Sequence, residues 1–271
     1  MPHLAVPGGS LHWESDGHAS APALLLIHAG IANLRMWDPL VPFLAVDHLV
    51  IRFDTRGFGQ TEFDDTAYSN RADAIAVLDH LGVRQATLVG ASRGGSIAID
   101  VALEHPERVS GLVVIGSGPS GFPEVELTPR EDAMLDAIDA AEAQGDWERV
   151  ADLETGFWDV GPLRETADVD PAFLRLAREL NRSNIRHASR AVEAIPLEPT
   201  AYERIDDITV PALVVVGEYD ITPALAQYEF LVDRIPDATG AIFHDSAHLP
   251  SLERADEFLH VLQDWLGDND L

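Results

Sequence analysis

The sequence predicts an α/β fold, a doubly wound and mostly parallel sheet with a helical cap inserted before the last two strands. Short apolar runs rich in β-branched residues alternate with segments of helical period, as in βα units around a parallel sheet. This alternation is interrupted from about residue 121 to residue 204 by charged, helical sequence without a convincing strand. The 271 residues, 46% of them hydrophobic, are enough for a large buried core.

The strands are predicted from short apolar runs bounded by turn-forming or polar residues. In chain order the expected strands are Ser10–Glu14, Ala23–His28, His48–Asp54, Ala86–Ala91, Gly111–Ile115, Ala212–Gly217 and Gly240–His244. The helices are predicted from apolar residues that recur at helical spacing between these runs. In chain order they are Met36–Val46, Asn70–Leu81, Arg93–His105, Pro223–Ile235 and Arg254–Leu266.

The interruption of the pattern divides the chain into two expected domains. Residues 1–119 and 205–271 form the α/β core, and residues 120–204 form a helical cap. An insertion between two strands of a parallel sheet extends from the carboxyl edge, where ligand crevices form in such sheets. We therefore expect the insertion to act as a lid over the site.

Composition limits the partners of the protein. Its 46 acidic residues outnumber its 18 basic residues, all of which are Arg. The resulting net charge near −28 repels nucleic acid and anionic membranes. A solvated surface with arginine favoured over lysine by coding bias is the preferred explanation of this composition, and adaptation to a salt-rich cytoplasm is the alternative. The chain has no Cys, which excludes disulfides and thiolate metal sites. With no signal-peptide pattern or membrane-length apolar run, we expect a cytoplasmic monomer or homodimer that acts on a small molecule.

The stretch Gly90-Ala91-Ser92-Arg93-Gly94 has two interpretations, a phosphate-binding turn or a nucleophile elbow. A dinucleotide site is disfavoured because Ser96 stands where a third glycine is needed, and because the turn follows several strands rather than the first. Short-chain dehydrogenases, which share part of the pattern, depend on a lysine that this chain lacks. An elbow fits better, since small residues two positions either side of the serine leave room for a sharp, strained turn.

A serine hydroxyl needs a base oriented by a carboxylate, and both follow in the sequence. Asp220 comes directly after the strand Ala212–Gly217, and His248 lies in the loop after Gly240–His244. The carboxyl ends of parallel strands meet at one edge, so both side chains are expected beside Ser92. Other histidines are expected to be scaffold, and Glu218, the competitor of Asp220, is expected to point elsewhere. These histidines are His28, His105 and His244.

Five motifs in register give the chain a resemblance to the α/β-hydrolase family over nearly its whole length. They are H-A-G-I at 28–31, D-T-R-G-F-G at 54–59, G-A-S-R-G-G at 90–95, G-E-Y-D at 217–220 and S-A-H-L-P at 246–250. Residues 28–45 also look like the corresponding loop of enol-lactonase-like members with a helical lid. The Ser, Asp, His order is that of the family.

The resemblance implies a serine hydrolase that cleaves a carboxylic ester or lactone through an acyl-enzyme on Ser92. His248 is then the base, Asp220 its orienting group, and the backbone amides of Gly30 and Arg93 the oxyanion donors. Ala29 replaces the usual glycine, so Ile31 is an alternative donor to Gly30. No metal and no organic cofactor is implied.

Other activities of the same fold stay open at this point. Cofactor-free haloperoxidase or perhydrolase activity and C–C bond hydrolysis use the same three residues, and some members are small-molecule receptors. Dehalogenases and epoxide hydrolases instead place Asp where Ser92 stands, and hydroxynitrile lyases rely on a lysine.

Aromatic and apolar residues of the cap and the oxyanion loop are candidates for a substrate pocket. We expect Trp158, Trp37 and Ile31 to line it, although core packing is the alternative for large aromatics. Arg93 departs from the methionine often found at its position. Its side chain is expected either to reach solvent or to favour anionic substrates.

Overall fold

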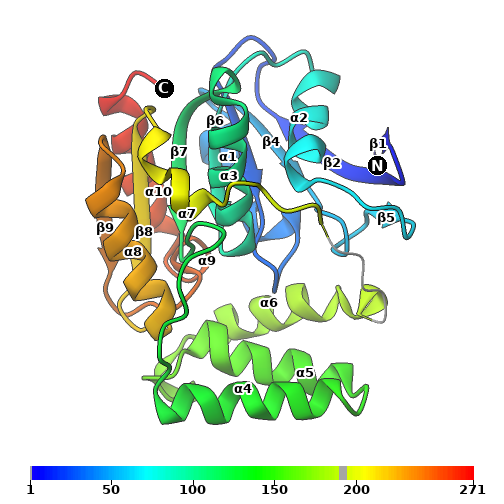
Figure 1. Ribbon diagram of the computed structural model, residues 1–271, viewed down its shortest axis with the longest axis vertical. Helices are drawn as coiled ribbons and strands as arrows, with labels where there is room; N and C mark the ends of the chain where they lie inside the picture. Colours follow the sequence, from blue (N-terminus) through cyan, green and yellow to red (C-terminus); the bar gives the residue numbers. More distant parts are fainter. Residues whose placement is uncertain (1, 189–193) are drawn as a thin grey trace.

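The computed structural model describes residues 2–188 and 194–271. These residues form a nine-stranded sheet that is parallel except at its N-terminal end (Figure 1). The strands are β1 His3–Val6, β2 Gly9–Asp16, β3 Ala23–Ile27, β4 Leu49–Phe53, β5 Glu62–Phe63, β6 Ala86–Ala91, β7 Val109–Ile115, β8 Ala212–Gly217 and β9 Ala238–Phe243. Their order across the sheet is β1-β2-β4-β3-β6-β7-β8-β9, with β5 paired to β2. This confirms the predicted doubly wound, mostly parallel sheet.

The helices follow the strands in the expected alternation, except where the cap interrupts it. The α-helices are α1 Val41–Leu44, α2 Asn70–His80, α3 Arg93–Glu104, α4 Pro129–Glu142, α5 Trp147–Glu154, α6 Pro171–Arg182, α7 Ala201–Arg204, α8 Thr222–Arg234, α9 Pro250–Glu253 and α10 Ala255–Asp268. A π-helical turn, η3 Thr155–Val160, continues α5, and short 3₁₀ turns include η1 Leu34–Trp37.

Both faces of the sheet are covered, so alternate residues of each central strand enter different cores. Val89 and Val113 pack with α10, whereas Leu88 and Leu112 pack with α2 and α3 on the opposite face. All residues of β3, β4, β6 and β8 are buried, as expected for strands between two helical layers. The buried core holds the carboxyl ends of these strands in fixed positions at one edge.

The insertion between β7 and β8 is largely a separate helical layer. Helices α4, α5 and α6 lie below the carboxyl edge of the sheet (Figure 1). Helix α7, although inside the interval 120–204, packs against α3, and Ala201 is fully buried in the core there. The end of the insertion therefore contacts the core, and the division at residues 120 and 204 stays a proposal.

Two parts of the N-terminal third differ from the sequence prediction. The edge strands β1 and β5 were not expected, because β1 is half exposed and β5 is only two residues long. The single helix expected over residues 36–46 is instead η1 followed by α1. Pro39 and Pro42 lie inside that interval, and a proline removes a backbone donor and clashes with the preceding helical turn.

The cap is attached to the core through a buried carboxylate at the start of α4. Glu131, 1% exposed, accepts a hydrogen bond from the backbone amide of Thr128 at 2.7 Å and so closes a capping box. The same carboxylate accepts bonds from the amide and hydroxyl of Thr222, at 2.6 and 2.9 Å, where α8 begins. Although burial raises the pKa of Glu131, these hydrogen bonds outweigh it, and the net pKa is lowered.

Replacing Glu131 by Gln is expected to lower the free energy of unfolding by about 1–3 kcal/mol, because an amide cannot accept all the bonds that a carboxylate accepts. Urea unfolding followed by circular dichroism measures the change. The control is Glu148→Gln, which breaks only an exposed pair with Arg182 and is expected to cost less than about 1 kcal/mol. Equal losses in the two variants would contradict the assigned role of Glu131.

Candidate active site

Ser92 occupies a strained turn between β6 and α3, as the glycine pattern predicts. Its backbone has φ 50° and ψ −121°, a conformation that L-residues rarely adopt. A Cβ at Gly90 would overlap the carbonyl of Gly94, and a Cβ at Gly94 would overlap the carbonyl of Ile27 on β3. The two glycines therefore allow the close chain approach that turns the Ser92 side chain out at the edge of the sheet.

Three side chains from distant segments form one hydrogen-bonded chain at this edge. The Oγ of Ser92 lies 2.8 Å from Nε2 of His248, and Nδ1 of His248 lies 2.8 and 3.0 Å from the two carboxylate oxygens of Asp220. Asp220 and His248 are 2% and 3% exposed, whereas Ser92 is partly exposed. The arrangement suits proton transfer from the hydroxyl to the imidazole, with the carboxylate holding the ring.

The carboxylate of Asp220 is oriented by local backbone. Its Oδ1 accepts a hydrogen bond at 2.8 Å from the amide of Ile221, directly before α8. Gly116, at the end of β7 with φ 52°, lies against the pair: a Cβ there would come 2.8 Å from the carbonyl oxygen of His248 and 3.1 Å from Oδ2 of Asp220. No local sequence signal points to Gly116, because only the fold brings the end of β7 against this loop.

The cap contributes directly to the position of His248. The amide of His248 donates to the carbonyl of Trp158 at 3.2 Å, and the two rings pack with centroids 4.5 Å apart. Trp158 belongs to the π-helical turn η3, which extends α5 toward the His248 loop. The imidazole is therefore fixed from the core side by Asp220 and from the cap side by Trp158.

A buried ion pair joins the same cap turn to the His248 loop. Arg164 and Glu253, each with a side chain 7% exposed, form two hydrogen bonds at 2.7 and 3.1 Å. Arg164 also donates to the carbonyls of Asp159, Val160 and Asp245 at 3.0, 2.8 and 3.0 Å. The guanidinium thus bridges the cap turn to the residue that starts the loop.

Glu253 completes this connection on the loop itself. Its Oε2 accepts hydrogen bonds from the hydroxyl of Ser246 at 2.9 Å and from the amide of Ala247 at 3.1 Å. Every donor that Glu253 binds is thus within the segment preceding His248 or on Arg164. Neither Arg164 nor Glu253 was a candidate from sequence, since no motif links two residues this far apart.

Asp159 is a buried acid next to this connection. It is 1% exposed, and neither carboxyl oxygen has a hydrogen-bond partner among the described residues. Burial raises its pKa well above the ordinary range, and the charges of Glu253 and Glu154 add to the effect while Arg164 opposes it. The neutral acid is therefore the favoured form, because a carboxylate here would be desolvated and repelled.

His28 is buried scaffold, as expected, whereas His244 lies after β9 and not inside the strand. Burial lowers the pKa of His28 to about 4, and the neutral ring accepts from the amide of Thr55 at 3.0 Å while its other nitrogen contacts the carbonyl of Ala29 at 2.8 Å. His244 faces solvent, with its side chain 79% exposed, and pairs with Glu218 at 3.1 Å. His28, His244 and Glu218 thus make their hydrogen bonds outside the chain that joins Ser92, His248 and Asp220.

The expected oxyanion donors lie next to each other. A Cβ at Gly30 would lie 3.7 Å from the Cβ and Cδ of Arg93, so the loop after β3 reaches the start of α3. Arg93 is the first residue of α3, and the amide of a first helical residue has no acceptor within its own helix. The choice of Gly30 over Ile31 as the second donor stays a prediction.

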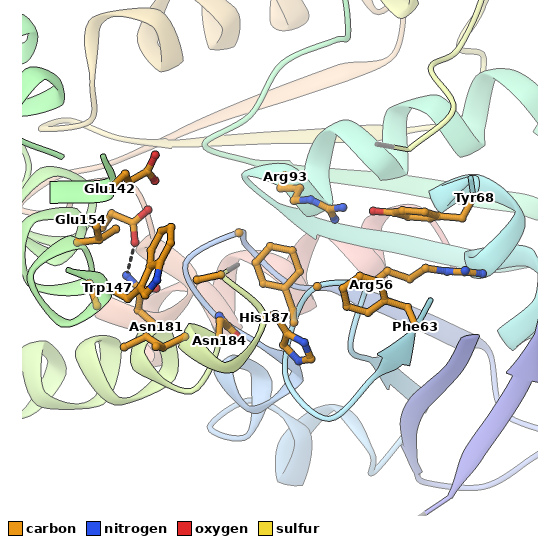
Figure 2. A pocket seen from close by; sticks show the side chains of 17 residues that line it. Arg56, Phe63, Tyr68, Arg93, Glu142, Trp147, Glu154, Asn181, Asn184 and His187 are labelled. Atoms are coloured by element: carbon orange, nitrogen blue, oxygen red, sulfur yellow. Dashed lines mark hydrogen bonds between the residues drawn. The ribbon is translucent and has the colours of Figure 1, made fainter. Parts of the chain in front are cut away.

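A cavity of about 330 Å³ lies between the core and the cap, and Gly30 and Arg93 form part of its wall (Figure 2). The core contributes further residues from β5 and the loops on either side of it, and the cap contributes residues of α4, α5 and α6 and of the turn after α6. They are Arg56, Gly57, Phe58, Phe63, Tyr68, Glu142, Trp147, Val150, Ala151, Glu154, Asn181, Asn184, Ile185, His187 and Ala188. Ser92 itself does not line the cavity, but the residue that follows it in the chain, Arg93, does.

The predicted pocket residues are placed differently from the expectation. Trp37 is 0% exposed and Ile31 is 7% exposed, and both pack in the hydrophobic core instead of lining this cavity. Trp37 belongs to η1, which lies against α6, so its size serves the contact between core and cap. Trp158 is partly exposed and contacts His248, but it does not line the cavity either.

The described residues contain no group of three or more His, Asp and Glu side chains placed to hold a metal ion. In the same part of the chain, no helix combines the length and apolar character that crossing a membrane requires.

Comparison with known proteins places this geometry in context. A family model described as alpha/beta hydrolase fold matches residues 22–255. The chain is 26% identical to 3-oxoadipate enol-lactonase 2 of Acinetobacter baylyi, over 96% of this chain and 94% of that protein. It is 30% identical to 2-hydroxymuconate semialdehyde hydrolase of a Pseudomonas species, over 94% and 90%. The solved enol-lactonase of Burkholderia xenovorans is 26% identical, with a TM-score of 0.77 over 98% and 100%.

Asp159→Asn is expected to change how stability depends on pH. Between the ordinary carboxyl pKa near 4 and the raised pKa, the folded protein binds more protons than the unfolded chain, so its free energy of unfolding falls as pH rises. The variant lacks this titration and gains stability relative to the parent over that window. Urea unfolding from pH 5 to pH 8 measures the difference.

The matched control for this experiment is Glu126→Gln, which neutralises an exposed acid in the linker before α4. Its stability difference from the parent is expected to stay nearly constant with pH. A constant difference for Asp159→Asn as well would show that the folded-state pKa of Asp159 is not raised.

Proposed function

The chain belongs to the α/β-hydrolase family, and from this premise we propose that it cleaves a carboxylic ester or lactone of a small, partly apolar substrate through an acyl-enzyme on Ser92. That the protein is a hydrolytic enzyme follows from the family and from relatives named as enol-lactonases and hydrolases. The single observation that supports the finer proposal is the hydrogen-bonded chain from Ser92 through His248 to Asp220.

The proposed reaction begins when Oγ of Ser92 attacks the substrate carbonyl carbon and its proton moves to Nε2 of His248. The oxygen of the carbonyl becomes negative and accepts hydrogen bonds from the amides of Gly30 and Arg93. Asp220 accepts the Nδ1 proton of the imidazolium, which stabilises its charge and keeps its orientation.

Collapse of this intermediate forms the acyl-enzyme, and His248 gives its proton to the departing alcohol or enol oxygen. In a lactone the leaving oxygen stays attached to the acyl group. Water then attacks the acyl carbon while His248 takes a proton from the water. As the bond between the acyl carbon and Oγ breaks, His248 gives this proton to Oγ of Ser92, which restores the hydroxyl and releases the free acid.

C–C bond hydrolysis is the second candidate. It is favoured by the 30% identity to a protein named 2-hydroxymuconate semialdehyde hydrolase. The same three side chains support it, so the two candidates differ in substrate and not in the groups used. Incubation with a 2-hydroxy-6-oxo-dienoate and loss of its conjugated absorbance tests this candidate, while release of 4-nitrophenol from esters tests the first.

We further propose that the protein acts on a small molecule in the cytoplasm, as a monomer or homodimer. Its net charge near −28 supports the absence of nucleic-acid and membrane partners, because polyanions repel one another.

Labelling with a fluorophosphonate, followed by peptide mass spectrometry, is expected to place the adduct on Ser92, since the probe reacts with an activated serine without assuming a substrate. Ser92→Ala is expected to abolish labelling and to lower kcat for 4-nitrophenyl esters by at least about 10⁴-fold.

The control is Ser96→Ala, one turn further along α3, which is expected to leave labelling and ester cleavage near the parent's level. An adduct on another residue, or full ester cleavage by Ser92→Ala, would refute the nucleophile assignment.

A further inference from the structure

The cavity carries opposite charge at its two ends. Arg93 and Arg56 lie at the core end, and Glu142 and Glu154 lie at the cap end beside Trp147 (Figure 2). A cavity that carries fixed charge favours ligand groups of the complementary sign, because burial weakens the screening by water. The core end therefore favours an anionic group of a substrate, and the cap end favours a neutral or cationic group.

Arg93 differs from the buried arginines of the described chain, which form ion pairs with carboxylates. The pairs are Arg52 with Glu14, Asp16 and Asp38, Arg56 with Asp73, Arg71 with Glu104, and Arg164 with Glu253. At the core end of the cavity, the charge of Arg56 is thus paired with Asp73 through two hydrogen bonds, at 2.8 and 2.9 Å.

The guanidinium of Arg93 has only neutral hydrogen-bond acceptors among the described residues. It donates to Oγ1 of Thr55 at 3.1 Å and to Oδ1 of Asn70 at 3.3 Å, it interacts with the hydroxyl of Tyr68, and it lies 5.0 Å from the centre of the Phe58 ring. Burial lowers its pKa, although Tyr68 and the charge of Asp73 oppose this effect. The Asp73 carboxylate attracts Arg93 but makes its hydrogen bonds to Arg56, so it does not close an ion pair with Arg93. Such a cation gains most from an anion brought by a ligand.

The neutral contacts also hold the guanidinium in place. Thr55 and Asn70 come from the end of β4 and the start of α2, and the Phe58 ring lies beside them, so the side chain is fixed on three segments. A planar guanidinium held this way is pre-oriented for a carboxylate, which it binds through two parallel hydrogen bonds. The side chain therefore does not serve merely to reach solvent.

We propose that Arg93 binds a carboxylate of the substrate, and that the substrate class is an ester or lactone whose acyl part bears one free carboxylate. The inference rests on the proposed function of the same site. Because the oxyanion-donating amide and the guanidinium both belong to Arg93, a substrate that binds both would have its reacting carbonyl at the Arg93 backbone and its carboxylate at the end of the Arg93 side chain. This couples recognition of the acid group to placement of the carbonyl.

The cap end limits the substrate to one carboxylate. Glu142 and Glu154 both line that end, and Glu154 is held by a hydrogen bond from Asn181 at 2.9 Å. A second carboxylate there would be repelled by these two side chains, whereas an apolar or cationic group fits beside Trp147. The substrate is therefore oriented with its carboxylate toward Arg93 and its neutral or cationic part toward the cap.

The test compares mono(4-nitrophenyl) glutarate with its methyl ester, which differ only in the free carboxylate. For the parent protein, kcat/KM is expected to be higher for the acid than for the methyl ester. In Arg93→Met the ratio of the two kcat/KM values is expected to fall about 10- to 100-fold, the value of a charge-assisted hydrogen-bonded pair. Arg93→Lys, which keeps the charge and loses the planar fork, is expected to give an intermediate ratio.

Arg130→Met serves as the matched control, because Arg130 is an exposed arginine of α4 that pairs with Glu165 away from the cavity. Its ratio is expected to equal that of the parent. An unchanged ratio in Arg93→Met, or an equal fall in Arg130→Met, would overturn the proposal. If Arg93→Met fails to fold, the Arg93→Lys ratio decides, since a value equal to the parent's also overturns it.

A binding measurement separates this inference from the proposed reaction. Monomethyl glutarate is titrated calorimetrically into Ser92→Ala and into Ser92→Ala combined with Arg93→Met, and the second protein is expected to bind about 10-fold or more weakly. This result stands even if Ser92 is not the nucleophile. Equal affinity of the two proteins, or equal affinity of Ser92→Ala for dimethyl glutarate, would refute the assigned role of Arg93.

Discussion

The hydrogen bond between Ser92 and His248 depends on two loops meeting at one edge of a parallel sheet. Ser92 follows β6 and His248 follows β9, and β7 and β8 lie between these strands. The elbow brings Ser92 out of the plane of the sheet, and Gly116 lets the His248 loop approach the end of β7. The 2.8 Å contact is therefore a property of the strand order, and small residues at the strand ends make it sterically possible.

The cap is a second support for this contact. Trp158 and the pair Arg164–Glu253 connect the π-helical turn of the cap to the loop that carries His248. Glu131 connects the cap to the start of α8, directly after Asp220. The base is thus held from the cap side, and the segment after Asp220 is tied to the cap through Thr222. A movement of the cap relative to the core would therefore disturb the geometry of the site as well as access to the cavity.

Two ionisable side chains near the site, Asp159 and Arg93, form no ion pair with a group of opposite charge among the described residues, and they have different consequences. Asp159 is favoured as the neutral acid, since burial and neighbouring glutamates oppose its ionisation. Arg93 cannot release its proton near neutral pH, so its charge persists inside the cavity wall. In a chain with net charge near −28, this cation gives the core end of the cavity a local sign opposite to that of the molecule, whereas Glu142 and Glu154 keep the cap end acidic.

The sequence alone determined the parallel sheet, the elbow at Ser92 and the order of Asp220 and His248. Strand periodicity and glycine spacing depend on residues close together in the chain, and the order of the two side chains can be read directly from their positions. The short edge strands escaped it, and so did the break of the helix expected over residues 36–46 at its prolines. Tertiary structure alone decided the roles of Gly116, Arg164 and Glu253, the burial of Trp37 and the exposure of Arg93 to the cavity. These depend on contacts between segments far apart in the chain, and no local sequence signal encodes which distant side chain will lie opposite.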